Sequence, residues 1–321
     1  MSKYILSIDA GTTGITVLLF DYNCNVVQKE YSEFTQIFPK PGWVEHDPEE
    51  IWNVTRLLVN SILDKHCHSD ICSIGITNQR ETTVIWDKKN SKPIYNAIVW
   101  QCRRTQDLCD DLIQKGYLDN IKNKTGLIVD SYFSATKINW IINNNDKAMQ
   151  LIENNDLLFG TIDTWLIWKL TGGKSHYTDH TNASRTMIYN INTNNWDNEL
   201  LNIFSIPKSS LPSILNSSDN FGVTSKKAIG CNISINGVAG DQQSALFGQN
   251  GFNKNDAKCT YGTGCFLLIN TGTERVDSNK GLLTTVCIDI NGKPCYAIEG
   301  SVFIGGAVIQ WLRDGLEILK N

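Results

Sequence analysis

Apolar and polar positions near the start of the chain predict a strand pair followed by a helix. Residues 3–8 predict a strand, residues 11–14 a glycine-rich turn, and residues 15–20 the returning strand of a hairpin. Further on, apolar positions recur on one helical face after Asp47, which is expected to cap the helix with Glu50 as its capping-box partner. The chain therefore begins with a β-hairpin and then a helix.

The same kind of pattern continues and mixes strands with helices. Residues 71–77 and 82–87 predict two further strands. Residues 162–173 predict a helix that Asp163 caps and that ends at a Gly-Gly pair. Residues 232–248 predict a strand that passes directly into a helix, with Asp241 at the carboxyl end of the strand. Such mixing predicts an α/β fold, in which this end of a strand commonly carries the chemistry.

The opening hairpin has a counterpart late in the chain. Residues 258–272 again read as strand, Gly-Thr-Gly turn and strand, and residues 301–320 predict a glycine-rich helix start and a helix. Two similar turns, about a domain's length apart, predict a duplicated fold whose halves face one nucleotide. The second half has only about 70 residues, fewer than a typical domain.

Composition narrows the class of protein. The 321 residues are 41% hydrophobic and 19% charged with a net charge of −4, so we expect no nucleic-acid partner and no attraction to anionic membranes. No long apolar run predicts a membrane span or a signal peptide. Ten cysteines without a CxxC pair are typical of reduced thiols. We therefore expect a cytoplasmic protein.

Several motifs resemble those of the glycerol kinases in the FGGY family of carbohydrate kinases. They include SIDAGTT, GITNQRETTVIW, GVAGDQQSALFGQ and TYGTGCFLLINTG, and the combination of NQRET with GDQQ points to glycerol. The resemblance covers essentially the whole chain. It implies a ribonuclease H-like, actin-like ATPase fold, with a complete N-terminal domain at residues 1–250 and the beginning of a similar nucleotide-binding domain at 251–321. It also implies ATP-dependent phosphorylation of glycerol to sn-glycerol 3-phosphate.

The resemblance implies a glycerol site with Asp241 as the general base. A carboxylate near the acceptor hydroxyl can orient it and take its proton. Simpler explanations exist: Arg80 and Glu81 could form a solvated ion pair, Asp241 could cap a helix, and the aromatic residues could belong to the core. The implied glycerol ligands are Arg80, Glu81, Trp100, Tyr132, Asp241, Gln242 and Phe266.

The resemblance also implies a site for ATP and Mg²⁺. Asp9 is expected to hold Mg²⁺ through water, because carboxylates with water are usual ligands of this ion. The turns provide small residues and backbone N–H groups that can converge on phosphates, although a single such turn could be a plain hairpin. The implied ATP ligands are Thr12, Thr13 and Gly14 in the first turn, and Thr263, Gly306 and Gln310 later in the chain.

Some features depart from the family pattern. Ala10, Gly14 and Thr16 stand where glycerol kinases commonly have Gln, Ser and Arg, which predicts an altered nucleotide affinity. Relatives continue beyond the equivalent of Asn321 with an adenine pocket, so we expect the chain to be truncated at its C-terminus. The alternatives are a kinase for another polyol or sugar, and an inactive remnant that lacks the adenine site. A homo-oligomer is possible.

Overall fold

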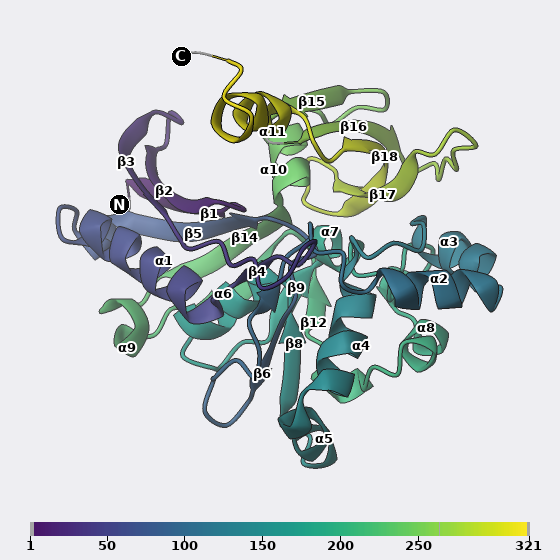
Figure 1. Ribbon diagram of the computed structural model, residues 1–321. Helices are drawn as coiled ribbons and strands as arrows, with labels where there is room; N and C mark the ends of the chain where they lie inside the picture. The colour runs from purple at the N-terminus through teal and green to yellow at the C-terminus, as the bar shows by residue number, and fades with distance from the viewer. Residues whose placement is uncertain (1–2, 263, 320–321) are drawn as a thin grey trace.

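Two β-sheets organise the molecule, and the computed structural model describes residues 3–262 and 264–319. The first sheet contains β1 (Tyr4–Ala10), β2 (Gly14–Asp21), β3 (Val26–Glu33), β5 (Ile71–Asn78), β13 (Ser218–Val223) and β14 (Ser234–Gly240). The second contains β15 (Ala257–Tyr261), β16 (Cys265–Gly272), β17 (Leu283–Ile288) and β18 (Pro294–Val302). Figure 1 shows the second sheet above the first, with α10 (Asp241–Gly248) between them.

The strand order of the first sheet determines where the site can form. The order is β13-β14-β5-β1-β2-β3, with β1 antiparallel to β2 and parallel to β5, and β5 parallel to β14. Ala10, Asn78 and Gly240 are register partners at the carboxyl ends of β1, β5 and β14. The segments that follow these strands therefore begin in one row, which is where open α/β sheets usually bind ligands.

One face of the first sheet is covered by α1 (Pro48–Leu63), α6 (Ile162–Leu170) and α9 (Lys226–Ile229), as Figure 1 shows. In β1, Leu6, Ile8 and Ala10 are fully buried against this layer, whereas Ser7 and Asp9 point to the other face. From α1, Ile51 and Val59 join the same core. The alternating pattern of the sequence thus places Asp9 on the face away from these helices.

A helical region with short strand pairs completes the part of the chain before α10. Its short strands are β4 (Glu45–His46), β6 (Val84–Asp87), β7 (Ala97–Ile98), β8 (Leu157–Gly160), β9 (Tyr177–Asp179), β10 (Tyr189–Asn190), β11 (Asn195–Trp196) and β12 (Ser213–Leu215). Its helices are α2 (Gln106–Gln114), α3 (Leu118–Thr125), α4 (Ser134–Asn144), α5 (Asp146–Glu153), α7 (His180–Ala183) and α8 (Asn198–Ile203). A second hydrophobic core lies here, around Phe133 and Ile138.

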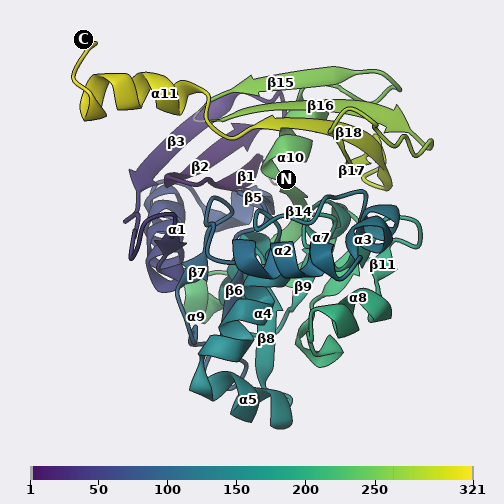
Figure 2. The same ribbon diagram turned by 45° about the vertical axis from the view of Figure 1, so that its right-hand side comes forward.

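The second sheet is antiparallel throughout, in the order β15-β16-β18-β17, and is followed by α11 (Gly306–Gln310). The predicted repeat of the opening hairpin is confirmed, because β15 and β16 pair across a glycine turn as β1 and β2 do. Figure 2 shows α10 beneath the second sheet, and α10 also contacts β14 and β5 of the first sheet. The molecule has the mixed α/β architecture that the sequence predicts.

The predicted cap Asp47 is confirmed, whereas the predicted capping-box partner Glu50 and the predicted cap Asp163 are wrong. Asp47 caps α1, but Glu50 accepts hydrogen bonds from Thr35 instead of closing a capping box. Helix α6 begins at Ile162, before Asp163, whose buried carboxylate accepts hydrogen bonds from two threonine hydroxyls. In both cases a distant tertiary partner competes for a carboxylate that the local pattern assigns to the helix end. Within the described residues, the helices include none long and apolar enough to cross a membrane.

Candidate active site

A cavity of about 450 Å³ lies beyond the aligned ends of β1, β5 and β14 and is bounded by β15 and β16 of the second sheet. Arg80 and Glu81 reach it directly after β5, and Asp241 and Gln242 reach it from the start of α10. Thr260 reaches it from β15. The cavity brings together most of the predicted site residues, which are Thr12, Thr13, Arg80, Glu81, Trp100, Tyr132, Asp241, Gln242 and Phe266.

Arg80 is anchored in the interior with one edge of its guanidinium toward the cavity. Nη1 and Nη2 donate to the two carboxylate oxygens of Glu299 at 2.6 and 3.2 Å. Nε lies 3.3 Å from Asp241 Oδ1. The side chains of Arg80 and Glu81 are each 2% exposed, so the alternative of a solvated ion pair is wrong.

Glu81 is held in an uncommon backbone conformation beside the cavity. Its φ is +61°, in the left-handed region that non-glycine residues enter at a cost of about 1–3 kcal/mol. Oε1 accepts a hydrogen bond from Arg185 Nε at 2.6 Å, and no donor to Oε2 is found in the described part of the chain. Burial raises the pKa of Glu81, against the opposing effects of Arg185 and Arg80. One carboxylate oxygen is therefore free to accept a ligand hydroxyl.

Arg185 and Glu299 are functional candidates that the sequence analysis missed. Arg185 follows α7, Glu299 lies on β18, and Arg185 Nη2 donates to Glu299 Oε1 at 2.8 Å. Although burial by itself raises the pKa of Glu299, Arg185 and Arg80 bring that pKa to about 2. The sequence held one clue to this pair. Glu299 is the single charged residue in β18, and a charge on a buried strand requires a partner.

Asp241 is the accessible carboxylate of this group. Its side chain is 37% exposed, and it lines the cavity. Helix α10 begins at Asp241 with Gly240 as its cap, so the alternative that Asp241 caps this helix is wrong. Oδ1 accepts from the Gln242 backbone N–H at 2.7 Å, and Oδ2 accepts from Gln242 Nε2 at 3.1 Å. An oriented, accessible carboxylate of this kind can take a proton from a hydroxyl.

Aromatic rings form one wall of the cavity. The ring centroid of Trp100 lies 5.7 Å from that of Tyr132 and 6.1 Å from that of Phe266. The ring centroid of Phe303 lies 5.0 Å from that of Tyr132, but Phe303 is outside the lining of this cavity. Burial raises the pKa of the Tyr132 hydroxyl, which therefore stays protonated and can donate a hydrogen bond. This wall can cover the carbon skeleton of a small polar ligand.

The first glycine turn presents unused backbone donors. Gly11 N–H donates to the Gly14 carbonyl at 3.0 Å, while the N–H groups of Thr12 and Thr13 have no acceptor in the described residues. The Thr12 hydroxyl accepts from Trp100 Nε1 at 2.9 Å, which links the turn to the aromatic wall. Gly14 does not line the cavity; a Cβ there would lie 2.7 Å from the Ser32 carbonyl. Two free N–H groups suit an anion such as phosphate.

Asp9 fits a magnesium site that the ligand itself would complete. Burial, and then the charge of Asp241, raise the pKa of Asp9 to about 6. No described residue donates a hydrogen bond to the Asp9 carboxylate, and the described residues include no cluster of three metal-ligating side chains. Mg²⁺ usually binds through one or two carboxylates with water and substrate phosphates. Asp9 is half-buried and does not line the cavity, but a carboxylate without a donor is suited to that role.

The second glycine turn is only partly described. Gly262 lines the cavity, and its carbonyl accepts from the Gly306 N–H at 2.7 Å. Gly306 itself is outside the cavity lining and contacts the turn through this bond. Thr263 and the side chain of Gln310 lie outside the described residues. Through Gly262, the second turn approaches the same cavity as the first.

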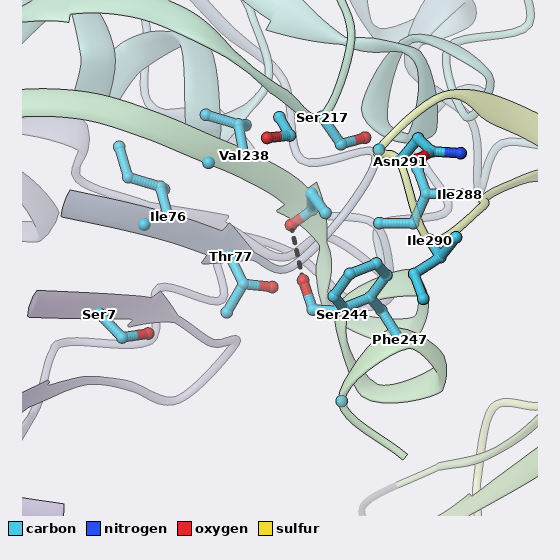
Figure 3. Close-up of a pocket in the computed structure, with 16 residues that line it drawn as sticks. Ser7, Ile76, Thr77, Ser217, Val238, Ser244, Phe247, Ile288, Ile290 and Asn291 are labelled. Carbon is cyan, nitrogen blue, oxygen red and sulfur yellow. Dashed lines mark hydrogen bonds between the residues drawn. The ribbon is translucent and has the colours of Figure 1, made fainter. Parts of the chain in front are cut away.

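A larger cavity of about 590 Å³ lies on the other side of α10 (Figure 3). Ser7 and Thr77 reach it from the first sheet, Phe247 from α10, and Asn291 from the connection between β17 and β18. None of the described residues that line it carries a charge. It therefore offers no carboxylate or cation for acid-base chemistry, unlike the smaller cavity.

Curated relatives match this chain along its whole length. Glycerol kinase 2 of Thermotoga maritima is 54% identical over 321 residues, which are 99% of this chain and 65% of the relative. A glycerol kinase of Clostridium botulinum is 57% identical over 323 residues, covering 100% of this chain and 65% of the relative. The chain thus spans about 65% of the length of these relatives.

Solved structures and family profiles agree with this similarity. The structure of Plasmodium falciparum glycerol kinase with ADP superposes with a TM-score of 0.92 at 43% identity, covering 99% of this chain and 64% of that one. Residues 4–248 match the N-terminal domain of the FGGY family of carbohydrate kinases, and residues 257–321 match its C-terminal domain. The cavity, its two glycine turns and these matches lead to one conclusion: the chain belongs to the FGGY family of carbohydrate kinases.

Proposed function

We propose that this protein transfers the γ-phosphoryl group of ATP to glycerol, giving sn-glycerol 3-phosphate and ADP. The observation that carries the proposal is the accessible Asp241 carboxylate, which shares a cavity with Arg80, Glu81 and the first glycine turn. The glycerol kinase relatives support glycerol as the substrate. The domain division at residue 250, the cytoplasmic location and a homo-oligomer stay predictions.

Each side chain would have a separate task in this reaction. The free Oε2 of Glu81, the Nε edge of Arg80 and the amide of Gln242 would bind the glycerol hydroxyls, and the aromatic wall would cover the carbons. Asp241 would accept the proton of the attacking hydroxyl as the oxygen–phosphorus bond forms. A closed, water-poor cavity would keep water from competing with glycerol as the acceptor.

The nucleotide would lie between the two glycine turns. The free N–H groups of Thr12 and Thr13 would bind its phosphates, and Thr263, Gly306 and Gln310 stay predicted ligands. Asp9 would hold Mg²⁺, which when bound neutralises charge on the transferring phosphoryl group. Neither turn contains a lysine that could do this directly, so oriented N–H groups are important for electrostatic stabilisation.

The direct test measures ADP formation with and without glycerol. Glycerol should stimulate ADP formation by the protein, and Asp241→Asn should lower the rate by about 10²–10⁴-fold, because it removes the base. Asp110→Asn, an exposed carboxylate on α2, is the matched control and should leave the rate unchanged. Equal ADP formation with and without glycerol would contradict the proposal. Competition by other polyols and sugars then tests whether glycerol is preferred.

A further inference from the structure

Lys258 is a buried cation beside the cavity that the proposed reaction does not use. It lies on β15 and is 3% exposed. Its Nζ donates to Gln242 Oε1 and, at 2.8 Å, to Thr260 Oγ1. Both partners line the cavity. Burying an ammonium group is costly, so its contacts with these two side chains need an explanation.

A second buried lysine, Lys137, has a structural role and serves as a comparison. Lys137 Nζ donates to the backbone carbonyls of Ser131, Tyr132 and Phe133 at 2.8, 2.5 and 3.0 Å. These bonds hold a backbone loop and leave no donor for a side chain. Among the described residues, the hydrogen-bond partners of Lys258 are both side chains, so it is placed to orient functional groups and not a backbone loop.

The contact with Lys258 decides which way the Gln242 amide points. An ammonium group can only donate hydrogen bonds, so it must face the amide oxygen of Gln242. The amide nitrogen is then directed to Asp241 Oδ2, 3.1 Å away. If the amide were reversed, its oxygen would face a carboxylate oxygen, which is repulsive. Lys258 and Asp241 therefore both favour this orientation of the amide beside the proposed base.

We propose that Lys258 is a positioning residue, whose ammonium group fixes the Gln242 amide so that it donates to Asp241. The proposal rests on the proposed function, because Asp241 is important as the base only if that function holds. It adds a residue from the second sheet to a site whose base lies on α10. A positioning role predicts that Lys258 and Gln242 act as one unit.

Burial and the charged groups around Lys258 bring its pKa into a pH range in which its loss of a proton can be followed. Burial, and then Arg80, lower the pKa of Lys258 to about 8, whereas Asp241, Glu299 and Cys259 act in the opposite direction. The ammonium form therefore prevails at neutral pH and is lost in mildly alkaline solution. Loss of the positive charge changes the electronic environment of the amide that it contacts, which gives a readout without any ligand.

The first experiment follows the ¹³Cδ NMR signal of Gln242 in the unliganded protein labelled at glutamine. We expect this signal, assigned with Gln242→Asn, to titrate with a midpoint near pH 8. Lys258→Met should abolish the titration, and Cys259→Ser should retain it, which excludes the neighbouring thiol as its source. With lysine labelled at ¹³Cε in the same sample, a Gln242 signal that does not move while Lys258 loses its proton would overturn the proposal, even if Lys258→Met failed to fold.

The second experiment measures glycerol binding by calorimetry in a double-mutant cycle. Lys258→Met and Gln242→Leu should each weaken binding by about tenfold, and the double variant should be no weaker than either single variant. Lys254→Met, an exposed lysine nearby, is the matched control and should bind as the unmodified protein does. If the two single losses of affinity multiply in the double variant, Lys258 and Gln242 act independently, and the proposal is overturned. Absence of glycerol binding in the unmodified protein would instead contradict the proposed function, and the NMR titration would still decide the role of Lys258.

Discussion

At the scale of single residues, four charged side chains are packed together in the interior. Arg80, Glu81, Arg185 and Glu299 are each at most 3% exposed, and their formal charges cancel. Each guanidinium contacts both carboxylates within 4.0 Å. Because the two positive and two negative charges neutralise one another, their burial costs less free energy. The ion pairs also hold the Arg80 guanidinium with its Nε edge directed at Asp241.

The first residue-scale prediction concerns Glu299→Gln. The change leaves two guanidinium groups with one carboxylate in the interior, so the free energy of unfolding should fall by about 3–5 kcal/mol. Urea denaturation measures this value. Glu274→Gln is the control, because Glu274 pairs with Lys254 at the surface and should change the free energy by less than about 1 kcal/mol. Equal effects of the two substitutions would contradict the expectation that the four buried charges depend on Glu299 for their stability.

The second residue-scale prediction concerns the pH dependence that Asp9 adds to stability. The folded protein raises the pKa of Asp9 to about 6 from 3.8, so between these pH values the folded state binds more protons than the unfolded state. This contribution lowers the free energy of unfolding as pH rises from about 4 to 6. Asp9→Asn removes it, so the variant should be more stable than the unmodified protein at pH 7.5, by up to about 3 kcal/mol.

Denaturation at pH 4 and pH 7.5 tests the Asp9 prediction. The gain in stability from Asp9→Asn should be small at pH 4 and larger at pH 7.5, whereas Asp110→Asn at the surface should show no such change. A gain that is equal at both pH values would mean that the Asp9 carboxylate is not destabilised by burial.

At the scale of elements, local patterns predicted most of the strands and helices around the site. The hairpins β1–β2 and β15–β16, helix α1 and the β14–α10 junction occur where the sequence indicates them. These elements are specified by turn residues, by the spacing of apolar residues and by the residues at helix starts, all of which are local features of the sequence. The capping roles predicted for Glu50 and Asp163 failed, and at both positions a more distant donor, Thr35 or Thr178, binds the carboxylate.

An element-scale prediction concerns the junction of α3 with β17. Gly126 ends α3 with φ +74°, and a Cβ there would lie 2.3 Å from the Thr284 carbonyl oxygen. Gly126→Ala therefore combines backbone strain with a backbone clash. Gly116→Ala is the matched control, because Gly116 has φ +82° and no atom within 4 Å of the added Cβ. Thermal and urea unfolding should show about 1 kcal/mol of loss for Gly116→Ala and clearly more for Gly126→Ala.

The comparison of these two glycines isolates the contact between α3 and β17. Both substitutions cost backbone strain at positive φ, and only Gly126 adds a collision with β17. Equal losses for the two variants would show that β17 can move away at no cost, so the junction would not hold the second sheet in place.

At the scale of the whole molecule, the second sheet is held to the rest of the chain by bonds from several elements. Thr284 N–H donates to the Gly126 carbonyl at 3.0 Å, and Gln243 Nε2 donates to the Val286 carbonyl at 2.9 Å. The ion pairs of Glu299 with Arg80 and Arg185 add a charged connection. The cavity is bounded by both sheets, so its shape depends on these connections remaining formed.

We therefore expect the two sheets to unfold as one cooperative unit. Native-state hydrogen exchange should give the same opening free energy for the central strands β1 and β5 and for β16 and β18. In Glu299→Gln, amides of β16 and β18 should open at lower free energy than those of β1, because the charged connection is broken. Much lower protection of β16 than of β1 in the unmodified protein would contradict this expectation.

The sequence by itself determined the α/β class, the hairpin repeat and the FGGY resemblance, and the resemblance implied nine of the residues that line the cavity. These follow from local periodicity and from short motifs, in which neighbouring residues act together. Only the tertiary structure identified Arg185, Glu299 and Lys258 as neighbours of Arg80, Glu81 and Gln242. Glu299 lies 219 positions from Arg80 along the chain, and their contact depends on how the second sheet packs against the first. Burial and charge pairing are properties of that packing, and a one-dimensional pattern does not contain them.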